Sequence, residues 1–344
     1  MRLPLAIRLP RRLLTASLLL LPLLLLLASC GGDKPGIAII EPWSGSDITG
    51  ARNAFLQTLK DANFKAAENA RFFVFNAQTQ QKSLDELAQH VADESHVQYV
   101  LAFGARALDR VKASTQKQVV YLLAYTPANP GGSRAAGPSG PAGPACPVPP
   151  CPTAGPTTTL VTRSFVGISA TAVSKSGLGV LAESVSGLRR VAVIYEKADP
   201  DSLVSHTDLS AEVLRFEVST GNDVSHVAKD AIAQGAQAIT VTPSVLLGQH
   251  FSDILNAAGS KVPVIGWSQS QVEDGALLAV GPDPESQGQK AAKLMLRLLR
   301  GEAIQNIQPI TDNTTLTWVN QKIAARLGIT LPPDVVAGAA KVVK

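Results

Sequence analysis

The chain has 344 residues, of which 31 are basic and 27 acidic, and 17% are charged while 45% are hydrophobic. This composition is typical of a folded α/β protein and excludes a disordered chain. The formal net charge of +4 comes entirely from Arg2, Arg8, Arg11 and Arg12, because residues 1–29 contain no acid. The rest of the chain is neutral and has no basic stretch, which excludes nucleic-acid binding.

The N-terminus has the layout of an export signal. The four arginines precede an almost wholly apolar run over 13–27, which ends in Leu27-Ala28-Ser29-Cys30. A membrane span would need roughly 20 apolar residues and a stop-transfer flank. Leu-Ala-Ser-Cys resembles the lipobox of bacterial lipoproteins, in which the cysteine becomes the first mature residue and carries lipid. We therefore expect a signal peptide over 1–29 and lipidation of Cys30; the alternative is a secreted protein with a chance cysteine.

Strand-like and helix-like segments alternate through the first part of the chain that follows. Short apolar runs rich in β-branched residues predict buried strands, and apolar residues at helical spacing predict amphipathic helices. Ser83 is an expected helix N-cap. The predicted strands are 36–40, 71–75, 97–103 and 119–124, and the predicted helices are 48–63, 83–94 and 105–115.

The alternation stops at Pro127. The segment to Thr159 is rich in Pro, Gly, Ala, Ser and Thr, which predicts an insert or linker without regular structure. It contains Cys146 and Cys151, whose spacing does not fit a zinc site. Outside the cytoplasm these two cysteines would form a disulfide or remain two free thiols, and the sequence favours neither.

After the insert the alternation resumes, which predicts a second set of βαβ units and a parallel sheet. The predicted strands are 166–169, 190–195, 217–219, 238–242, 262–265, 276–280 and 315–318, and the predicted helices are 172–185, 203–214, 224–234, 245–258, 284–299, 321–327 and 333–343. The expected fold class is α/β, with two Rossmann-like lobes that contain parallel sheets and a ligand cleft between the lobes.

The sequence predicts binding rather than catalysis. It has no Walker loop, no dinucleotide glycine fingerprint and no HExxH metal motif, so we expect no enzyme activity, cofactor or metal. The closest sequence to a nucleophile elbow, Gly266-Trp-Ser-Gln-Ser270, lacks the final glycine. In open α/β sheets, ligands bind beyond the carboxyl ends of the strands. The loops expected there are rich in small polar residues, which are also common in ordinary turns.

The order of several short motifs resembles one protein family. Residues 36–344, apart from the insert, are similar to the tryptophan/tyrosine-type substrate-binding proteins of ABC importers, which have the type I periplasmic-binding fold. The similar segments are 37–41 with 51–56, Phe75-Asn76-Ala77-Gln78, 164–169, 189–195, 262–265 with 273–277, 288–292 with 300–302, and Asn320 with 326–332. In that fold a ligand bridges two lobes that close by a hinge motion.

The resemblance implies a division into lobes, and the loops expected beyond the strand ends supply a set of candidate cleft residues. The expected division is a signal peptide over 1–29, a tether over 30–35, lobe 1 over 36–126 plus 284–307, an insert over 127–160 at the hinge, and lobe 2 over 161–283 plus 308–344. Asp47 and Asp283 are candidates to pair with a ligand ammonium group, and Arg106 to clamp a ligand carboxylate. The candidate ligand-binding residues are Asp47, Arg106, Thr126, Ser244, Ser268 and Asp283.

The resemblance also implies a function. We expect a membrane-anchored, extracytoplasmic, monomeric solute-binding protein that delivers an amino-acid-like ligand to the permease subunits of an ABC importer. A second hypothesis follows from Gly31, which in a two-membrane bacterium resembles an outer-membrane sorting signal. Under it the chain is an outer-membrane lipoprotein of the same fold that regulates a partner, as activators of penicillin-binding proteins do. Fold alone does not decide between the two.

Overall fold

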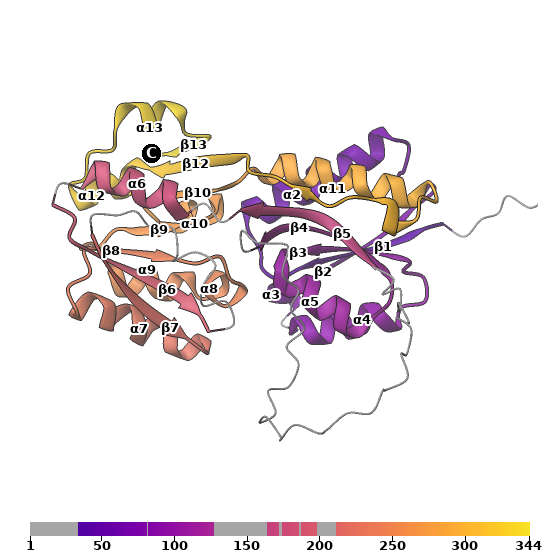
Figure 1. Cartoon of the computed structure of the whole chain (residues 1–344), viewed down its shortest axis with the longest axis horizontal. Coiled ribbons are helices and arrows are strands. Elements are labelled where there is room, and N and C mark those ends of the chain that lie inside the picture. The colour runs from indigo at the N-terminus through magenta and orange to yellow at the C-terminus, as the bar shows by residue number, and fades with distance from the viewer. Residues whose placement is uncertain (1–33, 81, 127–163, 172–173, 186, 198–210) are drawn as a thin grey trace, which may run out of the picture.

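The protein forms two lobes, each built on one sheet with helices on both faces (Figure 1). The computed structural model describes residues 34–80, 82–126, 164–171, 174–185, 187–197 and 211–344. The signal peptide, Cys30, most of the tether, Cys146, Cys151 and the insert lie outside the described residues. No helix within the described ranges is long and apolar enough to cross a bilayer.

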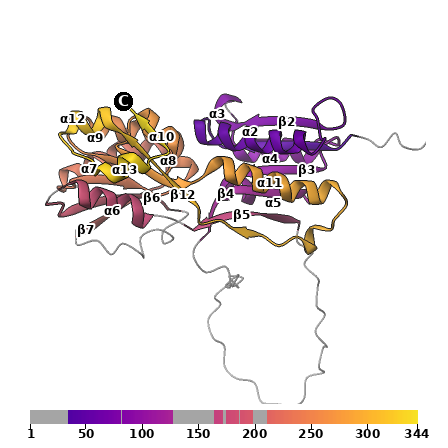
Figure 2. The same cartoon turned by 90° about the horizontal axis from the view of Figure 1, so that it is seen from above.

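The first lobe contains a six-stranded parallel sheet in the order β11-β5-β4-β3-β1-β2. One face is covered by α2 and α11, which lie toward the viewer in Figure 2, and the other by α4 and α5, which lie below the sheet in Figure 1. The elements are β1 (Gly36–Glu41), α2 (Ser46–Asp61), β2 (Arg71–Asn76), α3 (Ala77–Gln80), α4 (Leu84–Asp93), β3 (Tyr99–Phe103), α5 (Gly104–Ser114), β4 (Gln118–Thr126), β5 (Phe165–Thr171), α11 (Pro284–Leu299), η1 (Ile304–Asn306) and β11 (Ile310–Thr311).

Strand β1 shows why this sheet is buried on both faces. All six of its residues are buried. Ile37 and Ile39 pack in the cluster formed with α2 and α11, while Ala38 and Ile40 pack in the cluster formed with α4 and α5. Successive side chains of a strand point to opposite faces, so a continuous apolar run fills both layers at once.

The second lobe contains a seven-stranded sheet in the order β13-β12-β10-β9-β8-β6-β7. Its pairs are parallel except for β10 and β12, which are antiparallel. The elements are α6 (Ser174–Ser184), β6 (Arg190–Glu196), β7 (Glu212–Val218), α7 (Gly221–Ala233), β8 (Ala238–Val241), α8 (Val245–Gln249), α9 (Phe251–Ala258), β9 (Val264–Gly266), α10 (Gln269–Asp274), β10 (Leu278–Pro282), β12 (Thr315–Asn320), α12 (Gln321–Leu327), α13 (Pro333–Gly338) and β13 (Lys341–Val343).

Most expected elements are present, and Ser83 caps α4 with a complete capping box. Two segments were predicted wrongly. The helix expected over 203–214 is contradicted at its end, because β7 starts at Glu212 and pairs with β6; residues 203–210 lie outside the described ranges. The helix expected over 333–343 ends at Gly338, and Lys341–Val343 forms β13 beside β12. In both places the pairing with a neighbouring strand determines the structure.

The expected boundary at residue 161 does not match the sheets. Strand β5 pairs with β4, and β11 pairs with β5, so both belong to the first sheet. Residues 127–163 therefore connect two neighbouring strands of the same lobe, and not the two lobes. The chain passes between the sheets after β5, between β10 and α11, and between β11 and β12 (Figure 1).

The close crossing of α2 and α11 builds one side of the first lobe. These two helices make the most extensive contact between any two described elements. A Cβ atom on Gly288 of α11 would lie 2.1 Å from the carbonyl oxygen of Ala51 in α2. Because real Cβ atoms never come so close to backbone, only glycine permits this helix separation.

We expect Gly288→Ala to lower the free energy of unfolding by about 2 kcal/mol, because the added methyl group forces two packed helices apart. Gly50→Ala is the matched control. Gly50 lies within α2, where the nearest atom to an added Cβ is 3.9 Å away, so this change should raise the free energy by about 0.5 kcal/mol through reduced backbone entropy. Urea denaturation measures both. Equal effects of the two substitutions would contradict the packing argument.

Candidate functional site

A small cavity lies where the two lobes meet. Its walls carry Trp43, Trp267 and Trp318, together with Asp47 and Ser268. Leu123, Pro282 and Pro284 complete the walls. The cavity has a volume of about 20 Å³, close to the space that one water molecule needs. Lobe 1 contributes the loop after β1, the starts of α2 and α11, and Leu123 of β4; lobe 2 contributes the loop after β9, the end of β10 and Trp318 within β12.

All three tryptophans of the chain lie on this cavity. Trp43 is half-buried in the loop between β1 and α2, whereas Trp267 and Trp318 are 7% and 2% exposed. The backbone N–H of Trp267 donates to Oε1 of Gln271 at 2.8 Å. Gly281 makes room for the backbone of Trp267 and the ring of Trp318, because a Cβ there would lie 2.0 Å from the Trp267 carbonyl oxygen and 3.4 Å from the Trp318 ring.

Asp47 is a buried carboxylate in the first turn of α2. Its Oδ1 atom has no hydrogen-bond partner among the described residues. Burial raises the pKa of the Asp47 carboxyl, and the nearby charge of Glu273 adds to this; hydrogen bonds from the Ser270 hydroxyl and from the backbone of Asp47 and Ile48 act in the opposite direction. Asp47 is therefore a charge that the fold buries without satisfying it fully.

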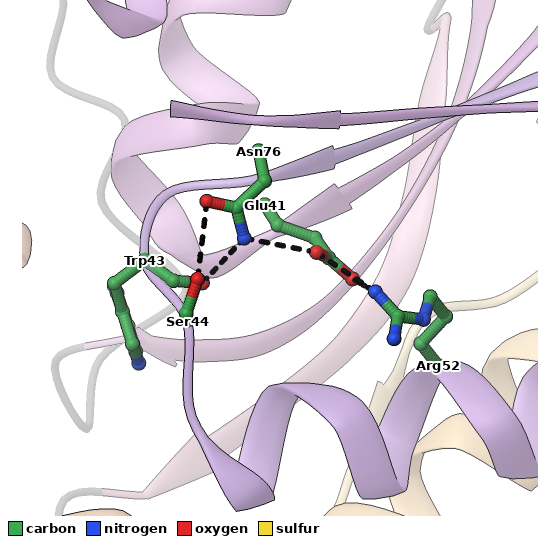
Figure 3. Close-up of polar contacts among 5 residues, drawn as sticks. All are labelled: Glu41, Trp43, Ser44, Arg52 and Asn76. Atoms are coloured by element: carbon green, nitrogen blue, oxygen red, sulfur yellow. Dashed lines mark hydrogen bonds and ion pairs between the residues drawn. The ribbon is translucent and has the colours of Figure 1, made fainter. Parts of the chain in front are cut away.

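A polar network fixes the loop that carries Trp43 (Figure 3). Arg52 Nη1 donates to both oxygens of the buried Glu41 carboxylate, at 2.8 and 3.0 Å. Asn76 Nδ2 donates to Glu41 Oε2 and to the carbonyl oxygen of Trp43, each at 3.0 Å. The Ser44 hydroxyl donates to Asn76 Oδ1 at 3.4 Å. The Trp43 side chain extends away from Glu41 and Arg52, so the network holds its backbone and leaves its ring toward the cavity.

Of the residues proposed from sequence, Asp47 and Ser268 come together on the cavity. The Ser268 hydroxyl lies 2.9 Å from that of Ser270. Two others cap helices: Ser244 accepts from the N–H of Leu247 at the start of α8, and Asp283 accepts from the N–H of Ser286 at the start of α11.

Thr126 and Arg106 complete the proposed set. Thr126 is the last residue of β4, and its side chain lies outside the described part. Arg106 lies on a different groove between the lobes, of about 300 Å³, and forms an ion pair of 3.0 Å with Glu196 of β6. The carboxylate that Arg106 holds in this structure is thus one from the opposite lobe.

Two further polar contacts join the lobes beside the cavity. The Ser46 hydroxyl donates to Glu273 Oε2 at 2.7 Å, and Gln249 Nε2 donates to the Pro42 carbonyl oxygen at 3.0 Å. With the Arg106–Glu196 pair they hold the two lobes against each other around the tryptophans.

Sequence reasoning missed the three tryptophans and the Glu41–Arg52–Asn76 network as parts of the site. Trp43 and Trp267 stand in loops that follow strands, where ligands of α/β sheets bind, and that position was the available signal. Trp318 lies within the antiparallel strand β12, and no local pattern points to it. Asn76 stood out only as part of the Asn-Ala-Gln tripeptide.

The sequence profile of the family described as ABC transporter substrate binding protein matches residues 164–343. Comparison with curated protein sequences finds no match. Three similar solved structures give the fold. A conserved domain protein from Vibrio cholerae has a TM-score of 0.72 at 17% identity, covering 90% of this chain and 99% of that chain.

The ABC domain from Streptococcus pneumonia in complex with L-Trp has a TM-score of 0.72 at 15% identity, covering 90% of this chain and 100% of that chain. A substrate-binding protein with adhesive properties from Clostridium difficile, in a ligand-free, open structure, has a TM-score of 0.58 at 20% identity, covering 90% and 99%. With the two parallel-dominated sheets, these similarities show the type I periplasmic-binding-protein fold.

We expect Asp47→Asn to raise the free energy of unfolding at neutral pH by about 1 kcal/mol, because a neutral amide replaces a buried, incompletely paired carboxylate. The raised pKa means that the folded chain binds the Asp47 proton more tightly than the unfolded chain does. The contribution of native Asp47 to stability is therefore full below its unfolded pKa and is lost as the pH rises through its folded pKa.

The stability difference between Asp47→Asn and the native chain should consequently widen as the pH rises above about 4, until the pH passes the raised pKa of Asp47 in the folded chain. Urea denaturation across this range measures it. Asp61→Asn is the control, since Asp61 is an exposed residue at the end of the same helix. A stability difference that stays constant with pH would contradict the conclusion that folding raises the pKa of Asp47.

We expect Arg52→Leu to lower the free energy of unfolding by about 2 kcal/mol, because it leaves the Glu41 carboxylate buried without its cation. The expected loss is smaller than for a fully buried ion pair, because 24% of the Arg52 side chain is exposed to solvent. Adding Glu41→Gln removes the unpaired charge and should restore part of the loss. Denaturation of the single and double variants measures this, and a double variant less stable than Arg52→Leu alone would refute the pairing.

Proposed function

Because this chain belongs to the ABC transporter substrate-binding protein family, we propose that it is an extracytoplasmic solute-binding protein. In this proposal it captures a small, amino-acid-like ligand between its lobes and delivers it to the permease subunits of an ABC importer. Binding, not catalysis, is the activity of such a protein.

One observation carries this proposal: the tryptophans and the incompletely paired carboxylate of Asp47 lie together at the junction of the lobes. Buried aromatic walls with a few polar groups are the usual composition of a small-molecule site. Trp43 and Asp47 come from the first lobe, whereas Trp267, Trp318 and Ser268 come from the second. A ligand held there contacts both lobes at once and so favours their closure.

The size of the cavity supports a hinge motion. A volume of about 20 Å³ holds roughly one water molecule and no organic ligand. The lobes must therefore separate to admit a ligand. The polar contacts between described residues that would break include the Arg106–Glu196 ion pair, Ser46 with Glu273, Gln249 with the Pro42 carbonyl, and the hydrogen bond from the Ser270 hydroxyl to Asp47.

We propose further that Cys30 anchors the chain to a membrane through lipid and that residues 1–29 are removed on export. Several acyl chains on one residue give stable attachment, at ~0.8 kcal/mol for each buried methylene. A short tether then keeps the two lobes close to the membrane in which the importer resides.

The second candidate is a lipoprotein that regulates a partner and transports nothing. Gly31 after Cys30 favours an outer-membrane position, and the small cavity is compatible with lobes that stay closed. The buried Asp47 argues against it, because permanent closure would retain an incompletely paired charge with no function.

The test is a screen of amino acids and small metabolites against the purified chain. A ligand at 100 times its Kd stabilises the folded state by about 2.7 kcal/mol. Since domains of 150–250 residues shift by about 2–4 °C per kcal/mol, we expect the Tm to rise by at least 5 °C. Trp43→Ala should abolish the shift, whereas Phe64→Ala, at a half-buried aromatic of lobe 1 that does not line the cavity, should retain it. A screen without any stabilising compound would favour the regulatory candidate.

A further inference from the structure

The walls of the tryptophan cavity carry negative charge only. Among the described residues that line it, Asp47 is charged and the others are aromatic, apolar or hydroxyl side chains. No lysine, arginine or histidine belongs to the lining. The two nearest arginines of the network and the rim are engaged elsewhere, Arg52 by Glu41 and Arg106 by Glu196.

The backbone N–H groups of α2, α11 and Trp267 do not supply the missing positive charge. The N-terminus of α2 would attract an anion, but the Asp47 carboxylate already occupies its first turn. Helix α11 begins with Pro284, which has no N–H to offer. The N–H of Trp267 is taken by Gln271. A ligand carboxylate in this cavity would meet indole rings, prolines, a second carboxylate and the Ser268 hydroxyl, at the start of the six-residue helix α10, but no cationic side chain.

A cation, in contrast, finds two kinds of favourable contact. Tryptophan is the aromatic side chain that attracts cations most strongly, and the attraction grows when the site excludes water. Pairing with an ammonium group would satisfy the Asp47 Oδ1 atom, which lacks a partner in the closed lobes. Three indoles and one carboxylate on the walls of one cavity have the composition of a site for a cation.

We propose that the ligand is an organic amine without a carboxylate, whose ammonium group pairs with Asp47 between Trp43, Trp267 and Trp318. This inference rests on the proposed function and narrows its amino-acid-like ligand to the class of cationic amines. An amino acid would lose affinity here because its carboxylate is desolvated without a cationic partner.

The experiment compares sets of compounds that share one side chain. Isoamylamine, L-leucine and 4-methylpentanoate form one set, and phenethylamine, L-phenylalanine and 3-phenylpropionate form another. The first member of each is a cation, the second a zwitterion and the third an anion. The full chain is purified in detergent, and its tryptophan fluorescence is titrated with each compound. All three tryptophans line the cavity, so the signal reports on this site.

We expect the amine of at least one set to change the fluorescence saturably, with an affinity at least tenfold higher than that of its amino acid, and no response to the acids. Asp47→Asn should weaken amine binding at least tenfold. Asp61→Asn, the same change on an exposed residue of α2, should leave it unaltered. Circular dichroism confirms that both variants are folded.

Three results would overturn the inference. If amino acids bind as tightly as amines, or more tightly, the proposed capture function stands and the cation class is wrong. If amines bind equally well to Asp47→Asn, the carboxylate does not recognise them. If no amine binds while the wider metabolite screen finds a ligand, the inference fails alone; if the screen also finds none, the proposed function fails with it.

Discussion

Burying a carboxylate in a folded protein costs free energy unless other groups compensate for its lost hydration, and this constraint organises the junction of the two lobes. The segment between β1 and α2 begins and ends with a buried acid, Glu41 and Asp47. Glu41 is compensated by Arg52 and Asn76. Asp47 is not fully compensated. The Glu41 carboxylate stabilises the loop. The Asp47 carboxylate instead keeps one oxygen atom, Oδ1, that can accept a further hydrogen bond.

The two acids differ because of what surrounds them. Glu41 ends a strand inside lobe 1, where Arg52 reaches it from the second turn of α2 and Asn76 from the adjacent strand β2. All of these partners belong to one lobe, so their bonds persist when the lobes part. Asp47 faces a cavity to which lobe 2 contributes Trp267, Ser268 and Trp318. Its surroundings therefore change with the distance between the lobes, and its burial is a property of the closed form.

Local patterns predicted the elements well and their assembly less well. Buried strands such as β1 and capped helices such as α4 follow from residues adjacent in the sequence, and these predictions are confirmed. The position of β5 depends on its pairing with β4 across residues 127–163, and that of β13 on pairing with β12. Such pairings are decided by packing between distant segments, which no local pattern records.

The same distinction holds at the site. Asp47 and Ser268 follow strand ends, and a rule about strand ends was sufficient to select them. Ser244 and Asp283 also follow strand ends, yet both cap helices, and only the geometry separates the two uses of such residues. Arg106 was expected to hold a carboxylate of the ligand, whereas in the structure it holds Glu196. Which carboxylate it meets depends on how the lobes face each other.

One strained residue links the cavity to the passage between lobes. Leu123, on the cavity wall, has a φ of 52° where the register of β4 shifts, a conformation that side chains other than glycine rarely adopt. Its N–H donates to the Oε1 atom of Gln287, in the first turn of α11, at 2.8 Å. Helix α11 begins directly after the chain leaves β10 in the other lobe. The Leu123–Gln287 hydrogen bond thus joins the cavity wall to the first turn of α11, where the chain returns from lobe 2 to lobe 1. A displacement of that wall would therefore act on α11 at a point where the chain crosses between the lobes.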